Sequence, residues 1–157
     1  MGQGPAPAVL SAHEAKEMAQ ALFDARATLT PIPAFTSARP ELGLMDGYAI
    51  QEHLVEMLVN SGEEITGYKL GLTSKAMQEL VGVDRPDFGP VFASTVFNDG
   101  AIIDVNTFIA PRMEAEIGII LGEDLTGPNC TPADAERAAA GVVASLQIVD
   151  SRIEGWK

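Results

Sequence analysis

The sequence predicts a mixed α+β fold in which an N-terminal pair of helices leads into a body of short strands. Three observations support this prediction. Apolar residues recur at helical spacing in two segments before Gly62. After Gly62, short β-like runs alternate with glycine, proline and aspartate turns. Two short helical pieces interrupt these runs, and no segment of the chain is repeated. The body is therefore expected to mix strands with helices.

The two N-terminal helices have recognisable boundaries. Ser11 and Glu14 fit a capping box ahead of apolar residues at helical spacing, which predicts a first helix to about Thr28. The proline-rich segment 30–40 is expected to be an irregular crossing segment between the two helices. Each proline removes a backbone donor and biases the preceding residue away from helix. A second helix is predicted over 44–60, where a Ser-Gly pair ends it.

The body is expected to contain four strands and two short helices. One helix is capped by Ser74 and runs to about Val81. The other is opened by Thr131-Pro132 and runs to about Gly141. Asp99-Gly100 between two apolar runs predicts a hairpin turn. The strands are expected at 65–72, 101–105, 116–121 and 143–149.

Charge and composition restrict the partners. The chain of 157 residues is 46% hydrophobic, enough to bury a core, and carries a formal charge of −12 from 22 acidic and 10 basic residues. This balance argues against nucleic acid and anionic membrane as partners, because both are bound through lysine and arginine. An acidic protein that binds an acidic small molecule needs a local positive centre, such as a metal ion or a buried lysine.

The compartment is predicted to be the cytoplasm. The single cysteine, Cys130, excludes an intrachain disulfide, which is typical of a reducing environment. Residues 1–9 lack both the basic start and the long apolar run of a signal peptide. The apolar stretches also fall far short of the ~20 residues that cross a bilayer. We therefore expect a soluble protein.

Glu114 and Glu116 are the strongest candidates for chemistry. On a strand, residues two apart lie on the same face, so both carboxylates would project together. Two like charges so close repel each other unless a cation lies between them. Paired carboxylates suit a hard divalent cation such as Mg²⁺ or Mn²⁺. The alternative is a strand entrance at which both glutamates face water.

Three further polar positions have both a functional and an ordinary interpretation. Lys69 lies in a glycine-flanked apolar run, so it is either an edge residue that reaches solvent or a cation near the acidic pair. Residues 84–90 are expected to form a rigid turn around Asp87, and turn aspartates commonly accept backbone hydrogen bonds. Residues 147–152 offer either one or two further oxygen ligands or a common surface pair between Asp150 and Arg152.

Four motifs taken in order resemble one known family. They are Lys69-Leu70-Gly71-Leu72-Thr73-Ser74, Pro86-Asp87-Phe88-Gly89, Glu114-Ala115-Glu116 and Ile148-Val149-Asp150-Ser151-Arg152. Together they resemble the hydratase and decarboxylase branch of the fumarylacetoacetate hydrolase superfamily, closely over 65–157 and more loosely before it. Within the branch, Ser74-Lys75, Pro86-Asp87-Phe88-Gly89 and Val96-Phe97-Asn98-Asp99-Gly100 look more similar to the 2-hydroxypenta-2,4-dienoate (2-keto-4-pentenoate) hydratases than to the 4-oxalocrotonate decarboxylases.

The resemblance implies a fold, a division of the chain into two regions, and relatives that are longer than this chain. It implies a mixed β-roll of the family type, with residues 1–62 as an N-terminal helical region and 63–157 as the first part of a metal-binding catalytic domain. Relatives continue further, and 143–149 reads as an interior strand, so we expect a C-terminally truncated chain with a large exposed apolar surface. Family members form homo-oligomers and sometimes complexes with a pathway enzyme.

The resemblance also implies site residues. Glu114 and Glu116 match metal ligands. Gln147 stands where the family commonly has a glutamate, so the third ligand is either Gln147 or Asp150. The remaining matches are catalytic Lys69 and Asp87, and substrate-binding Leu72, Ser74, Phe88 and Gly89.

The implied reaction is metal-dependent hydration of 2-hydroxypenta-2,4-dienoate to 4-hydroxy-2-oxopentanoate in the meta-cleavage catabolism of aromatic compounds. The substrate is thus a small 2-oxo or 2-enol carboxylic acid, and the enzyme class is a hydro-lyase. One alternative is 4-oxalocrotonate decarboxylation, a carboxy-lyase reaction that uses the same metal-enolate chemistry. The other is an inactive binding or assembly subunit.

Overall fold

The computed structural model describes residues 7–156, which form two compact units. The first unit runs to Asp104 and includes the segment from Arg152 onward, and the second spans Val105–Ser151. Each contains helix and antiparallel sheet, so the mixed α+β class is confirmed. The division into domains predicted at residue 62 stays a prediction. Among the described residues, no helix is both long and apolar enough to cross a membrane.

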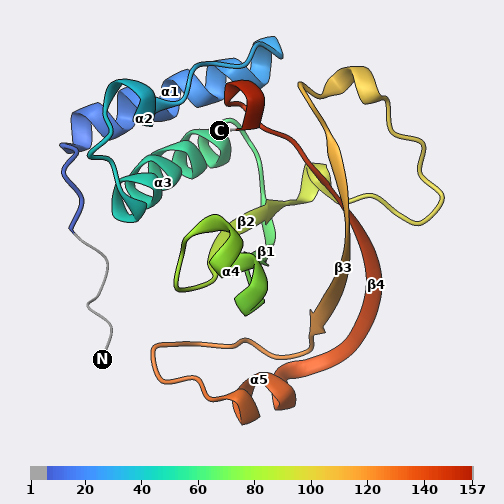
Figure 1. Ribbon diagram of the computed structural model, residues 1–157. Helices are drawn as coiled ribbons and strands as arrows, with labels where there is room; N and C mark the ends of the chain where they lie inside the picture. The colour runs from blue at the N-terminus through green and yellow to red at the C-terminus, as the bar shows by residue number, and fades with distance from the viewer. Residues whose placement is uncertain (1–6, 157) are drawn as a thin grey trace. The chain divides into compact units, whose positions relative to one another are not determined.

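Helices α1 (Ala12–Thr28) and α3 (Leu44–Asn60) pack together in the first unit and form most of its core (Figure 1). The predicted capping box of α1 is confirmed, because Ser11 Oγ accepts from the Glu14 N–H and the Glu14 carboxylate accepts from the Ser11 N–H at 2.8 Å. The predicted bounds of α3 are confirmed. Alanines on α1 let the larger side chains of α3 approach closely; the core is Ala15, Ala19, Ile50, Leu54, Leu58 and Phe92.

The proline-rich crossing holds one short helix that the sequence did not predict, α2 (Phe35–Ala38). Ahead of it, Ile32 forms a parallel bridge with Ile153. The Ile32 N–H donates to the Arg152 carbonyl at 2.9 Å, and the Glu154 N–H donates to the Ile32 carbonyl at 2.9 Å. These hydrogen bonds join residues 152–154 to the proline-rich segment. The 3₁₀ turn η3 (Glu154–Trp156) follows.

The first sheet pairs β1 (Ile65–Gly71) with β2 (Asp87–Phe92) in antiparallel register. Helix α4 (Lys75–Val81) lies between them in sequence and has the predicted Ser74 cap. The turn predicted over 84–90 is wrong from Asp87 onward, because these residues form β2. Pro90 lies in a strand of a two-stranded sheet, where each strand is an edge, and edge strands are where sheets accept proline.

The second unit is built on β3 (Arg112–Leu121) and β4 (Ala139–Val149), which pair antiparallel along their length. The 3₁₀ turn η2 (Val105–Thr107) precedes β3, and helix α5 (Pro132–Ala138) precedes β4. The helix predicted to about Gly141 ends earlier because Ala139 already pairs with Leu121 in the sheet.

The strand predicted at 101–105 is wrong. The turn at Asp99-Gly100 does form, since the Ala101 N–H donates to the Asn98 carbonyl at 3.1 Å and Gly100 has φ 80°. The turn is preceded by the 3₁₀ turn η1 (Ala93–Thr95) instead of a strand, so it closes no hairpin. Ile102 is 100% exposed. An apolar run without a partner strand in the described chain gains no ladder and stays irregular.

Candidate functional site

The pairing of β3 with β4 brings the three predicted metal ligands to one face of this sheet. Glu114 lies directly opposite Gln147, and Glu116 lies opposite Ser145. Directly opposed residues of an antiparallel pair have Cβ atoms ~4.5–5.5 Å apart, and residues two apart on a strand share a face. The two carboxylates and the amide therefore form a compact set of oxygen donors, the acidic face of the sheet.

The opposite face of the same sheet is apolar and exposed. Its members alternate with the acidic-face residues along both strands. The larger ones are 63–75% exposed: Met113, Ile117, Ile119, Val142 and Leu146. This agrees with the predicted exposed apolar surface. The two glutamates thus lie on one face together with some aliphatic residues, among them Ile120 and Val143, whereas the larger side chains of the other face are all apolar.

The donor set on the acidic face fits a hard divalent cation. Carboxylate and amide oxygens are the ligands that magnesium and calcium take in proteins. Among the described residues, no group of three His, Cys, Asp or Glu side chains could hold a metal. The Gln147 amide lies opposite Glu114 and could add an oxygen donor to the two carboxylates. Glutamine adds no negative charge, so Glu114 and Glu116 would supply all the charge from these three side chains.

Asp150, the alternative third ligand, already has backbone partners. Its Oδ2 accepts from the Ile109 N–H at 2.8 Å, and its Oδ1 accepts from the Ala110 N–H at 2.7 Å and the Ser151 N–H at 3.1 Å. These bonds join the end of β4 to the loop that leads into β3. Asp150 is therefore a structural clamp, which favours Gln147 over Asp150 as the third oxygen ligand.

The two predicted catalytic residues share one face of the first sheet. Lys69 lies opposite Gly89, and Gly71, two residues along, lies opposite Asp87. A Cβ atom on Gly71 would lie 2.1 Å from Asp87 Oδ1 and 3.1 Å from its Cγ. The Asp87 carboxylate therefore occupies the space beside the Gly71 backbone that a side chain at position 71 would fill.

The predicted substrate-binding pair Phe88 and Gly89 is divided between the two faces of β2. Gly89 is on the Lys69 side. Phe88 is on the other side, where its ring stacks on Tyr48 of α3 with centroids 5.1 Å apart and planes at 27°. Gln51 also donates to the Phe88 carbonyl at 3.3 Å. Phe88 thus fastens β2 to α3, and its substrate-binding role stays a prediction.

The loop from β1 to α4, which carries Leu72 and Ser74, is held by a residue that sequence reasoning missed. Gln78 is buried, and its Nε2 donates to the Leu72 carbonyl at 2.7 Å. Lys75 donates to Gln78 Oε1 at 3.1 Å, and Ser74 Oγ accepts from the Met77 N–H. A glutamine within the short α4 was the available sequence signal. Its amide supports the left-handed backbone at Leu72, where φ is 53°.

A hollow of about 680 Å³ opens in the first unit beside two predicted site residues, Leu72 and Asp87. We call it the Asp87 hollow. Arg85 in its wall donates from Nε to Asp84 Oδ1 at 2.7 Å and from Nη2 to Oδ2 at 3.0 Å. This pair lowers the pKa of Asp84 and raises that of Arg85. The full lining is Pro7, Val9, Glu41, Gly43, Leu44, Asp46, Leu72, Gly82, Val83, Asp84, Arg85, Pro86 and Asp87.

Comparison with known proteins finds relatives that carry the same functional name, 2-keto-4-pentenoate hydratase. No protein-family model matches the chain. A 2-keto-4-pentenoate hydratase of Burkholderia vietnamiensis is 40% identical over 139 residues, 88% of this chain and 53% of that protein. The 2-keto-4-pentenoate hydratase 1 of Dechloromonas aromatica is 45% identical over 121 residues, 75% of this chain and 46% of that protein. The chain spans about half the length of these curated relatives.

A solved structure shows the same fold. The 4-oxalocrotonate decarboxylase from Pseudomonas putida G7, complexed with magnesium and adipate, matches with a TM-score of 0.89 and 29% identity, covering 96% of this chain and 57% of that one. The chain belongs to the hydratase and decarboxylase branch of the fumarylacetoacetate hydrolase superfamily. The family resemblance carried by the four sequence motifs is thereby confirmed.

Within this superfamily member, the candidate site residues come from both compact units. The first unit holds the lysine and aspartate with the four substrate-binding candidates, and the second holds the three metal-ligand candidates. Strand register places Lys69 and Asp87 on one face in the first unit, and the three metal-ligand candidates on one face in the second. That Lys69 lies close to Glu114 and Glu116 stays a prediction.

Proposed function

We propose that the full-length protein is a metal-dependent hydro-lyase that converts 2-hydroxypenta-2,4-dienoate to 4-hydroxy-2-oxopentanoate within a mixed β-roll. The observation that carries the proposal is the β3–β4 register, with Glu114 opposite Gln147 and Glu116 on the same face. The names of the curated relatives support the hydratase assignment, and the magnesium and calcium complexes of the decarboxylase support a divalent metal.

Three side chains would hold the metal. Glu114 and Glu116 would bind it through carboxylate oxygens, and Gln147 through its amide oxygen. When bound, a divalent cation supplies a Lewis acid for the substrate's carboxylate and 2-oxygen. Replacing the family's glutamate by Gln147 removes one negative charge, so we expect weaker metal affinity than in relatives with three carboxylates.

Lys69 and Asp87 would handle the protons. Loss of the 2-hydroxyl proton and gain of a proton at C5 convert the dienol to a conjugated 2-oxo-3-enoate. Water then adds at C4 and loses a proton, and C3 gains a proton to give 4-hydroxy-2-oxopentanoate. Lys69 would hold the 2-oxygen as negative charge develops there, or give it a proton. Asp87, fixed by its close approach to Gly71, would orient the water or accept its proton.

One alternative has direct support. A 4-oxalocrotonate decarboxylase would use the same chelating residues, and the solved relatives are decarboxylases. Product analysis separates the two reactions. The full-length protein is incubated with 2-hydroxypenta-2,4-dienoate and, separately, with 4-oxalocrotonate, each with and without magnesium. Magnesium-dependent formation of 4-hydroxy-2-oxopentanoate supports the proposal, whereas carbon dioxide release from 4-oxalocrotonate alone would replace it by the decarboxylase.

A lysine variant tests the catalytic assignment in the same assay. Lys69→Met should lower the hydration rate by roughly 10²–10⁴-fold, because it removes a proton donor and a positive charge. The melting temperature should change little. Lys16→Met, at an exposed position of α1, is the matched control and should keep full activity. Equal rates for the two variants would exclude Lys69 from the reaction.

A further inference from the structure

We propose that Gln78 is a positioning residue, which holds Asp87 beside Gly71 by fixing both ends of the connection between β1 and β2. This connection, residues 72–86, contains α4. All the contacts that carry the proposal lie within the first unit. Its consequence for turnover rests on the proposed function, in which Asp87 orients the water or accepts its proton.

The amide of Gln78 is buried and has a defined orientation. Gln78 is 4% exposed, its Nε2 donates to the Leu72 carbonyl at 2.7 Å, and its Oε1 accepts from Lys75 Nζ at 3.1 Å. A protonated lysine only donates and a carbonyl only accepts, so the reversed amide would lose both bonds. Gln78 is therefore a fixed donor directed at the segment that leaves β1.

The backbone at Leu72 depends on such a donor. Leu72 has φ 53°, in the left-handed region where the Cβ of an L-residue crowds the following carbonyl oxygen. A bulky residue keeps this conformation only when its surroundings impose it, and such residues cluster at functional sites. The hydrogen bond from the buried amide holds the Leu72 carbonyl in place. Without that bond, Leu72 should relax to an extended conformation.

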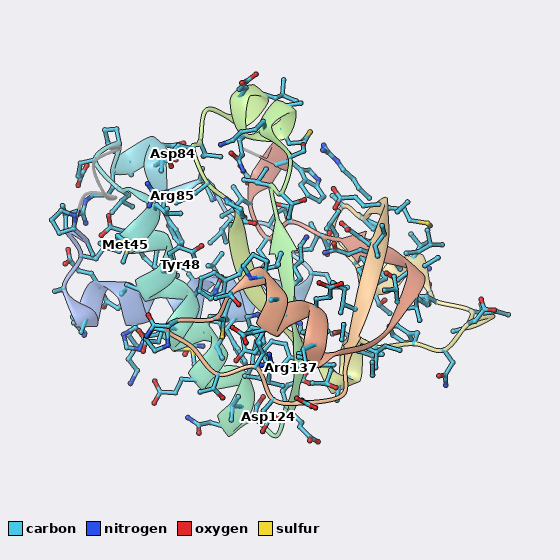
Figure 2. All side chains as sticks on the ribbon, turned by 90° about the horizontal axis from the view of Figure 1, so that it is seen from below. Met45, Tyr48, Asp84, Arg85, Asp124 and Arg137 are labelled. Atoms are coloured by element: carbon cyan, nitrogen blue, oxygen red, sulfur yellow. The ribbon has the colours of Figure 1, made fainter. Side chains whose placement is uncertain are left out.

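The backbone carbonyl of Gln78 fixes the other end of the connection. The N–H groups of Gly82 and Val83 both donate to it at 2.9 Å. Gly82 ends α4 with φ 81°, and the chain continues through Asp84 and Arg85, which are labelled in Figure 2, to the start of β2. One residue thus joins the segment that leaves β1 to the segment that enters β2.

Asp87 responds to both ends because it belongs to the last pair of the β1–β2 register. It lies opposite Gly71, the residue before Leu72. The end of a ladder opens more easily than its middle, and the Asp87 carboxylate lies in the space that a side chain at Gly71 would fill. Leu72, Val83 and Asp87 also line the Asp87 hollow together. The connection that Gln78 closes therefore keeps the carboxylate in place.

Crystal structures of the full-length wild type and Gln78→Met test the position of Asp87 without an activity assay. Methionine has a similar length but cannot donate to the Leu72 carbonyl. We expect φ of Leu72 to leave the left-handed region and the Asp87 carboxylate to move away from Gly71. Gln20→Met, at an exposed position of α1, is the control and should change neither. Unchanged Leu72 and Asp87 in Gln78→Met would overturn the inference.

Hydration kinetics test the consequence for turnover. Gln78→Met should lower kcat about 10- to 100-fold with little change in KM, because a displacement of about 1 Å can cost that much in rate. In an Asp87→Asn background, the same substitution should cause almost no further loss, because Gln78 acts through Asp87. Additive losses of the two substitutions, or a lower melting temperature with unchanged kcat, would overturn the inference.

Lys75→Met gives a milder test if Gln78→Met does not fold. Lys75 is exposed, and its loss frees only the Oε1 side of the amide. The fall in kcat should be smaller and should again vanish in Asp87→Asn. A rate equal to that of Lys16→Met, with Leu72 unmoved, would overturn the inference. A wild type that hydrates nothing would overturn the proposed function instead, and the crystal structures would still decide whether Gln78 positions Asp87.

Discussion

The α1–α3 helical pair and the β3–β4 sheet use apolar residues in opposite ways. The helices bury Ala15, Ala19, Ile50, Leu54 and Leu58 against each other and form the main core. The longest strands of the described chain leave a row of large aliphatic side chains exposed. Side-chain burial therefore holds the helical pair together, whereas the sheet depends on its backbone ladder.

This difference separates stability from candidate chemistry. Glu114 and Glu116 are exposed residues of a sheet that buries little, so changing their charge removes no core contact. The core leucines belong to the first unit, and the acidic face belongs to the second. The two kinds of substitution should thus have separable effects on turnover and on unfolding.

The largest effect is expected from Glu116→Gln in the full-length protein. It removes half of the negative charge that Glu114 and Glu116 offer a cation, with almost no change in shape. Loss of a residue that merely supports a metal ligand costs up to about 100-fold, so loss of a ligand should lower magnesium-dependent hydration by at least that factor. Glu136→Gln on α5 is the control. Metal-independent activity retained by Glu116→Gln would contradict a shared cation.

A pair of leucine substitutions compares the two regions directly. Leu54→Ala in α3 should lower the free energy of unfolding by about 2–5 kcal/mol, because this side chain is 9% exposed. Leu146→Ala in β4 should cost under about 0.5 kcal/mol in the 157-residue chain, because Leu146 is 71% exposed. Both are measured by urea unfolding. Equal costs would mean that the apolar face of β3–β4 is covered.

A smaller effect, on turnover, is expected from Gly71→Ala. The new methyl group would lie 2.1 Å from Asp87 Oδ1, so the carboxylate must move away. A displacement of about 1 Å can cost up to about 100-fold in rate. Gly67→Ala adds the same methyl group on the same strand, where no atom lies within 4 Å. Hydration by Gly71→Ala that matches Gly67→Ala would show that the position of Asp87 is unimportant.

The smallest effect should be a pH-dependent loss of stability in Asp46→Asn. Asp46 accepts backbone hydrogen bonds from Val9, Leu10 and Gly43, which lower its pKa below the ordinary 3.8. This stabilisation is present above pH 3.8 and is lost as the pH falls through the folded-state pKa. Asparagine turns an NH₂ group toward one of these donors, so the melting temperature at pH 7 should fall by about 5 °C.

Asp99→Asn, at an exposed turn position, is the reference for that comparison. Melting curves between pH 2 and pH 7 should converge for Asp46→Asn and wild type at the acid end, because protonated Asp46 no longer differs in charge from asparagine. Curves that stay parallel over the whole range would contradict the assigned role of the Asp46 charge.

Local patterns were sufficient for the helices and for the acidic pair. The capping box and helical spacing predicted α1 and α3 because their signals lie within a few residues. Alternation along one strand placed Glu114 and Glu116 on a common face. Gln147 is different, because its position opposite Glu114 depends on a partner strand more than twenty residues away. The sequence alone offered residues 147–152 as oxygen donors, and the family resemblance matched Gln147 to a ligand position.

The errors arose where strand pairing overrides local preference. Gly89 and Pro90 are typical of turns, yet β2 forms because β1 offers a partner at the right register. The run at 101–105 has strand-like composition, but no described strand pairs with it. Gln78 escaped notice because nothing in a short helix shows that its amide is buried and directed to the Leu72 carbonyl.

The Asp150 clamp also has a practical consequence for protein engineering. A slip of the β3–β4 pairing by one residue would move Gln147 to the face opposite Glu114 and Glu116. Asp150 prevents this by holding the start of β3 and the end of β4 together, at the end of the sheet away from the loop that joins the two strands. That exposed connection, 122–131, can therefore accept a fluorescent reporter or a longer linker, and the ligand face keeps its register.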